Sequence, residues 1–115
     1  MRVLVLAKEG NDSEAATPPT PEAMAAYQRF NGELVKAGVV VGSGRLSSSS
    51  HGKRVQFDGK KRTVIDGPFA ESKELVGGYW LWEVRSLAEA LEWLKRAPYE
   101  GGTFEVREVS MHEGA

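Results

Sequence analysis

Residues 75–84 have the sequence Leu-Val-Gly-Gly-Tyr-Trp-Leu-Trp-Glu-Val, which is the strongest indication of the fold. A strand alternates its side chains between two faces, so Trp80 and Trp82 share one face. Tyr79 and Leu81 then take the other face. Because both faces are apolar, we predict a strand that is covered from both sides.

A helix is predicted directly after this strand. Ser86-Leu87-Ala88-Glu89 has the pattern of a capping box, with serine at the N-cap and glutamate three residues later. The helix is expected to run from Leu87 to about Arg96, with Pro98 just beyond its end. Its expected apolar stripe contains Leu87, Leu91 and Leu94, alongside Ala90 and Trp93.

The first half of the chain repeats this order of strand and helix. Arg2 to Ala7 is predicted to be a strand that is apolar on both faces, followed by a polar loop from Glu9 to Pro19. Thr20-Pro21-Glu22 is a helix start, and Gly38 is placed to end that helix. Val39-Val40-Val41 begins the second strand.

A hairpin separates the two halves, and a last strand closes the chain. Arg54 to Phe57 and Arg62 to Ile65 flank Asp58-Gly59, which is a good turn signal, although weak alternation leaves the register open. Between Arg45 and Arg62 there are six basic residues and one acidic residue. Thr103 to Ser110 is predicted to be the final strand.

The predicted order is β-α-β-(hairpin)-β-α-β, which favours one ferredoxin-like α+β sandwich over residues 1–115. Two helices can cover only one face of such a sheet. We therefore expect the other face to pack against a second copy, giving a homodimer with paired sheets. The alternative is that the hairpin folds back over that face.

Composition excludes several classes of protein. The 115 residues include no cysteine, which removes disulfides, thiolate nucleophiles and cysteine-ligated metals. The net charge is −1, so nucleic-acid binding is not expected, and the basic segment has a single interleaved aromatic residue, Phe57. No apolar run is long enough for a membrane span, and no signal peptide is apparent. We expect a cytoplasmic protein.

The nine residues from Asp66 to Glu74, Asp-Gly-Pro-Phe-Ala-Glu-Ser-Lys-Glu, are followed by Gly77-Gly78-Tyr79-Trp80. This pattern resembles the YCII-related, or DGPF-domain, family, and nearly the whole chain fits the resemblance. It implies a dimeric α/β barrel with ferredoxin-like protomers. It also implies either an enzymatic role resembling small isomerases and monooxygenases, or a regulatory role linked to extracytoplasmic-function sigma factors.

Asp66 is the candidate catalytic residue, because a carboxylate at a strand end can act as a base or bind a polar group. Aspartate before Gly-Pro is equally an ordinary turn residue. Candidate substrate-binding residues are Arg45, Phe69, Lys73 and Tyr79. The His–Asp pair proposed in shorter relatives is not carried over, because neither His51 nor His112 matches it.

Two classes of function therefore remain open. The first is a small organic molecule bound near Asp66, with cofactor-free proton transfer and with Lys73 or Arg45 holding an anion. The second is a non-enzymatic interaction module that uses the basic hairpin or a sheet edge. No metal or cofactor is expected, because the two histidines lack the spacing of metal ligands. A walled pocket at Asp66 would favour the first class, and an exposed Asp66 the second.

Overall fold

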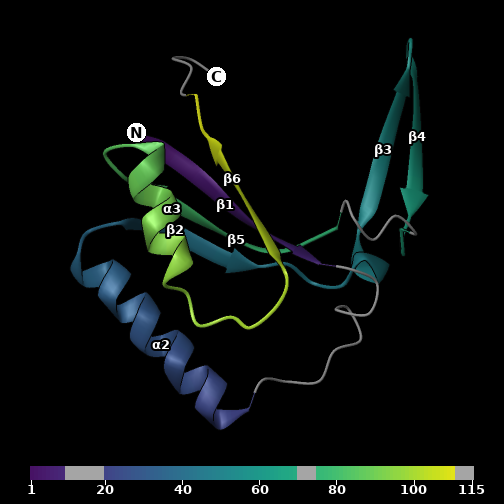
Figure 1. Cartoon of the computed structure of the whole chain (residues 1–115). Helices are drawn as coiled ribbons and strands as arrows, with labels where there is room; N and C mark the ends of the chain where they lie inside the picture. Colours follow the sequence, from purple (N-terminus) through teal and green to yellow (C-terminus); the bar gives the residue numbers. More distant parts are fainter. Residues whose placement is uncertain (10–19, 70–74, 111–115) are drawn as a thin grey trace.

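The computed structural model describes residues 1–9, 20–69 and 75–110 (Figure 1). The elements in chain order are β1 (Arg2–Glu9), α2 (Pro21–Lys36), β2 (Val40–Arg45), the short 3₁₀ helix η1 (Ser49–His51), β3 (Lys53–Asp58), β4 (Lys61–Asp66), β5 (Leu75–Glu83), α3 (Leu87–Lys95) and β6 (Thr103–Glu108). The predicted elements are all present. The predicted loop ran from Glu9 to Pro19. Glu9 instead ends β1, and the rest of that loop lies outside the described residues.

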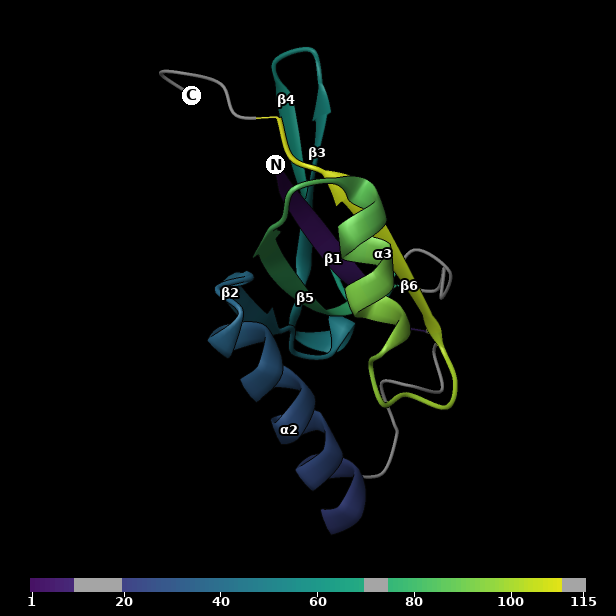
Figure 2. The same cartoon turned by 60° about the vertical axis from the view of Figure 1, so that its left-hand side comes forward.

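Four strands form an antiparallel sheet in the order β2-β5-β1-β6. Strand β1 lies in the middle and pairs with β5 on one side and with β6 on the other. Both helices lie on the same face of the sheet (Figures 1 and 2). This arrangement confirms the predicted ferredoxin-like α+β fold.

The core lies between the helices and this face. Val3 is paired with Trp82, and Val5 with Trp80, so the four side chains form the floor of the core. Phe30 and Leu34 from α2 and Ala90 from α3 pack against them. Trp80 and Trp82 therefore share a face, as predicted.

The predicted stripe of α3 is partly wrong. Leu87 and Leu91 are 46% and 41% exposed, whereas Ala90 is fully buried. Trp93 and Leu94 pack against the core beside Ala90. The helix therefore faces the sheet with Ala90, Trp93 and Leu94, and Leu87 and Leu91 lie outside the core.

We call the other face of the sheet the open face, defined by Leu4, Leu6, Tyr79 and Leu81. Leu4 is paired with Leu81, and Leu6 with Tyr79. The leucines are half-buried and Tyr79 is 39% exposed, and neither helix covers them. Ion pairs border this apolar centre, with Arg2 beside Glu83 and Lys8 beside Glu105.

The hairpin, residues 53–66, forms a separate two-stranded sheet that we call the arm. Gly59 has a φ of 60° in the two-residue turn that joins Asp58 to Lys61, a conformation that suits glycine. Every residue of both arm strands is exposed. The arm therefore does not fold back over the open face.

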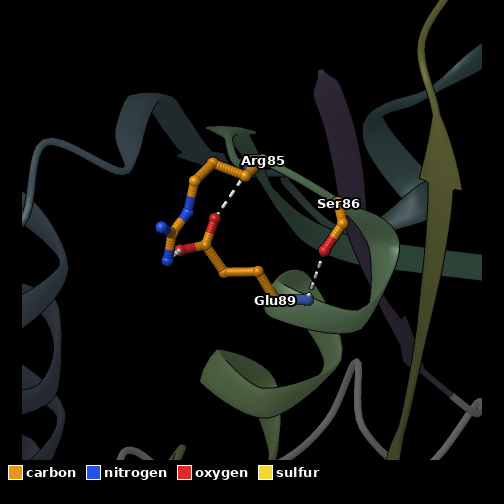
Figure 3. A network of polar contacts seen from close by, with 3 residues as sticks. All are labelled: Arg85, Ser86 and Glu89. Carbon is orange, nitrogen blue, oxygen red and sulfur yellow. Dashed lines mark hydrogen bonds and ion pairs between the residues drawn. The ribbon is translucent and has the colours of Figure 1, made fainter.

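Helix α3 begins with a variant of the predicted capping box (Figure 3). The Ser86 hydroxyl accepts a hydrogen bond from the Glu89 N–H at 3.1 Å. The Glu89 carboxylate accepts one from the N–H of Arg85, at 2.7 Å, and not from that of Ser86. The hydrogen bond from this backbone N–H lowers the pKa of Glu89, and the Arg85 side chain lowers it further against the opposing effect of burial.

This lowered pKa predicts an acid-sensitive contribution to stability. The folded state binds the Glu89 proton less tightly than the unfolded state does, so the contribution is complete above the unfolded-state pKa. It is lost as the pH falls through the folded-state pKa. We expect the stability advantage of wild type over Glu89→Gln, measured by urea unfolding at several pH values, to shrink towards acid.

Glu92→Gln removes a charge from the same helix and is the control for net charge. Identical pH profiles for the two variants would contradict the prediction.

Within the described residues, no helix has the length and apolar character needed to cross a membrane.

Candidate functional site

Asp66 ends strand β4 at the base of the arm. It lies opposite Lys53, and the Lys53 Nζ is 2.5 Å from the Asp66 Oδ1. The next residue of β3, Arg54, has its guanidinium 3.9 Å from the centre of the Phe69 ring. Because Lys53 and Arg54 are consecutive residues of one strand, the ion pair and the cation–π contact lie on opposite faces at the base of the arm. We call these four residues the arm root.

The backbone of the Asp66-Gly67-Pro68-Phe69 segment is fixed against η1. The Gly67 N–H donates to the Gly52 carbonyl at 3.0 Å, and the Phe69 N–H donates to the Ser49 hydroxyl at 3.3 Å. A Cβ atom on Gly67 would lie 1.8 Å from the Ser49 carbonyl oxygen. Only glycine fits this close approach of two backbone segments, so the motif has a clear structural role.

The ion pair at the arm root is open to solvent. The Asp66 and Lys53 side chains are 73% and 65% exposed. An exposed pair of this kind contributes about 0–1 kcal/mol to stability. The carboxylate is therefore accessible to a ligand, and the pair itself adds little to folding.

Two other candidates, Arg45 and Tyr79, lie at the β2–β5 pairing. Gly44 is paired with Tyr79, and Arg45 with Gly78, so successive side chains point to opposite faces. Tyr79 belongs to the open face, and its ring covers Gly44, where a Cβ would approach within 2.7 Å. Arg45 is on the face that carries the helices. Among the described residues, these two side chains do not join Asp66 in one contact cluster.

Lys73, Glu71 and Glu74 fall in residues 70–74, outside the described residues, as does His112. His51 is exposed in η1. Within residues 1–9, 20–69 and 75–110, there is no group of three or more histidine or acidic residues arranged to hold a metal ion.

An aromatic cluster lies on the helix side of the sheet. Tyr99 is next to Phe104, with ring centres 4.9 Å apart, and Tyr27 stacks on Trp80 at 6.2 Å. Burial raises the pKa of the Tyr99 hydroxyl to about 12; Tyr27 adds to the rise and the positive charge of Arg45 opposes it. Tyr99 is therefore a neutral hydrogen-bond donor at physiological pH.

A shallow surface depression of about 250 Å³ lies between the end of α3 and the start of β6, with Tyr99 and Phe104 in its wall. Asp66, Trp80 and Tyr79 do not line it. The depression and the arm root are therefore separate features of the described structure.

Sequence reasoning missed Lys53 as the partner of Asp66. The signal was present in the turn, because strands joined by a two-residue turn pair outward from it. Counting from Asp58 opposite Lys61 places Lys53 opposite Asp66. The aromatic partners Tyr27, Tyr99 and Phe104 had no comparable signal, because they come from three separate segments.

The sheet order and the two helices on one face define a ferredoxin-like α+β protein. The sequence matches the model of the YCII-related domain over residues 1–112. It is also 33% identical to an uncharacterised protein of Rhizobium meliloti (strain 1021) over 93 residues, which cover 78% of this chain and 73% of that protein. The chain belongs to the YCII-related family.

Proposed function

We propose that this YCII-family protein binds a small organic anion at the arm root. The observation that carries the proposal is the exposed Lys53–Asp66 contact, which puts a cation and a carboxylate side by side at the base of the arm. The Lys53 ammonium is suited to hold a carboxylate or phosphate of the ligand. The η1 turn holds the backbone of this segment in place.

Cofactor-free proton transfer is the chemistry that fits these groups. The Asp66 carboxylate would take a proton from an acidic C–H or O–H bond of the ligand and return it to a second atom. Such an isomerisation balances without an oxidant or reductant. Lys53 would hold the anion formed in between, which is the role first assigned to Lys73 or Arg45.

We propose further that the functional unit is a homodimer with paired open faces. Leu4, Leu6, Tyr79 and Leu81 form an apolar centre that the helices leave uncovered. Apolar sheet faces are stabilised by packing against a second sheet. A partner sheet on this side would also narrow the solvent space around the arm root.

Asp66→Asn tests the role of Asp66 as a base. We expect the variant to bind organic acids at least as tightly as wild type, because it lacks the negative charge that repels an anion, and to lose the exchange of the bound ligand's acidic proton, because the amide cannot accept a proton. Its melting temperature without ligand should change by only a few degrees, because the exposed pair contributes about 0–1 kcal/mol. Stability and binding are measured by thermal shift against a panel of small carboxylates and phosphate esters, followed by calorimetry, and the exchange of a C–H proton of a ligand that binds is followed by NMR in D2O.

Asp58→Asn is the matched control, since Asp58 is also an arm carboxylate but lies at the tip, opposite Lys61. Undiminished proton exchange in Asp66→Asn would refute the role of Asp66. A large fall in the melting temperature of Asp66→Asn would assign the carboxylate to folding instead.

A non-enzymatic interaction module is the second candidate. The 73% exposure of the Asp66 side chain and the full exposure of the arm strands favour it. Failure of every organic acid to bind wild type would support this candidate over the first.

A further inference from the structure

One row of residues across the sheet has small side chains in its two middle positions. Strand pairing aligns, in order, Arg45 of β2, Gly78 of β5, Ala7 of β1 and Phe104 of β6. The row faces the helices, because Gly78 is two residues before the buried Trp80. Neighbouring strands lie about 4.8 Å apart, so the outer two residues are separated by about 14 Å. Gly78 and Ala7 contribute only a hydrogen and a methyl group between them, and we call this part of the row the recess.

The space above Gly78 is open. Among the described residues, a Cβ atom there would meet within 4 Å only the Gly44 carbonyl oxygen, at 3.1 Å, and the Cα of Arg45, at 3.9 Å. Both atoms belong to the backbone of the neighbouring strand β2, so no described side chain fills the space. Glycine weakens the interior of a strand and often marks a site where a ligand approaches the backbone closely.

Four aromatic rings form a connected wall around the recess. Trp80 lies in the next row, and Tyr27 stacks on it with ring centres 6.2 Å apart. Tyr99 lies 6.3 Å from Tyr27 and 4.9 Å from Phe104, also between ring centres. Tyr99 and Phe104 line the surface depression at the end of α3 as well. The recess therefore has flat apolar sides and an arginine at its β2 end.

Two polar groups of the recess lack partners. Arg45 is exposed and forms no ion pair with any residue that the structure describes. Its positive charge acts on the Tyr99 hydroxyl and opposes the rise in the pKa of that group, so the two side chains lie near each other. The Trp80 indole N–H is buried and has no acceptor among the described residues. Buried donors are nearly always hydrogen-bonded, so a cation and an orphan donor together point to a missing anionic acceptor.

We infer that the recess binds a planar aromatic carboxylate, with its ring over Gly78 and its carboxylate towards Arg45. A guanidinium holds a carboxylate through two parallel hydrogen bonds, and the neutral Tyr99 hydroxyl is a further donor nearby. Aromatic rings pack favourably against one another, whereas a small aliphatic anion would leave the flat sides of the recess unused. This site is separate from the arm root and does not rest on the function proposed there.

The first test uses the unmodified protein with benzoate as the probe. Benzamide has the same ring without the charge, and acetate has the charge without the ring. The NMR signal of the Trp80 indole N–H reports binding at the recess. We expect benzoate to shift this signal, and the two controls each to need at least about tenfold higher concentration for half of their full shift, because each lacks one of the two contacts.

The second test removes the charge at the recess. We expect Arg45→Gln to weaken benzoate binding at least about tenfold, since a hydrogen bond to a charged group is lost. Arg29→Gln is the matched control, because Arg29 is an exposed arginine of α2 two residues from Tyr27. It should change the affinity less than about twofold, because solvent and salt screen a distant surface charge. Thermal unfolding should show that both variants remain folded, as both side chains are exposed.

Every outcome bears on the inference. A Trp80 signal that benzoate leaves unchanged up to its solubility overturns the site. Equal affinity for benzoate and benzamide overturns the role of Arg45. Benzoate binding that is lost in Lys53→Gln but intact in Arg45→Gln places the anion at the arm root, which overturns this inference and supports the proposed function. Binding that requires Arg45 and the aromatic ring supports the recess, whatever the arm root does.

Discussion

Replacing Trp82 with alanine should lower the free energy of unfolding by about 3–5 kcal/mol, the range for large aromatic side chains truncated in a core. Trp82 has no exposed surface and lies against Val3 in the centre of the sheet. Its ring is 5.4 Å from that of Trp80, so truncation also removes an aromatic contact. Because small domains have a total stability of about 5–15 kcal/mol, this loss is a substantial fraction of the total.

Trp82→Phe is the informative control for this prediction. The Trp82 indole N–H is buried and has no hydrogen-bond partner among the described residues. Phenylalanine therefore keeps most of the packed volume and gives up no hydrogen bond. Urea unfolding followed by far-UV circular dichroism should show a loss well under half of that in Trp82→Ala. Equal losses would mean that the indole group itself, and not the filled volume, stabilises the core.

Replacing Gly67 with alanine is the second change for which we expect a large effect. The added Cβ would meet the Ser49 carbonyl oxygen at 1.8 Å, and both groups belong to the backbone, so no side-chain rotation relieves the clash. Moving one segment would break the Gly67–Gly52 and Phe69–Ser49 hydrogen bonds at the arm root. We expect a loss of about 2–3 kcal/mol, typical of overpacking.

Gly32→Ala is the control, because we expect it to raise the free energy of unfolding instead of lowering it. Gly32 lies within α2, and a Cβ there would meet nothing within 4 Å. Alanine should stabilise the helix by about 0.5–1 kcal/mol. Wild-type stability of Gly67→Ala in urea unfolding would show that the backbone at the arm root is able to rearrange, which would contradict the prediction.

Local patterns were sufficient to predict most of the fold. Thr20 and Pro21 begin α2 as expected, with the Thr20 hydroxyl accepting from the Ala23 N–H at 3.1 Å. Gly38 follows the helix with a φ of 74°, a conformation that favours glycine. Apolar residues on both faces of β1 and β5 predicted strands covered from both sides; the helices bury one of these faces, and the open face is left half-buried. These signals depend on neighbouring residues, which is why sequence alone contains them.

The errors and omissions came from tertiary contacts. Periodicity gave α3 the right bounds but could not decide that Ala90, rather than Leu87 or Leu91, meets the sheet. The partner of Asp66 was missed because weak alternation in the hairpin left its register open. Whether Arg45, Phe69 and Tyr79 bind a ligand depends on surfaces that two distant segments form together, and periodicity does not describe such surfaces.

The position of β1 in the sheet has a consequence for folding during synthesis. Strand β1 ends at Glu9, but its neighbours β5 and β6 begin at Leu75 and Thr103. The apolar side chains of β1 therefore leave the ribosome long before the strands that cover its edges. Such long-range pairing slows folding and prolongs the exposure of aggregation-prone segments. The order of the strands thus leaves β1 without either of its neighbours until β5 has been synthesised.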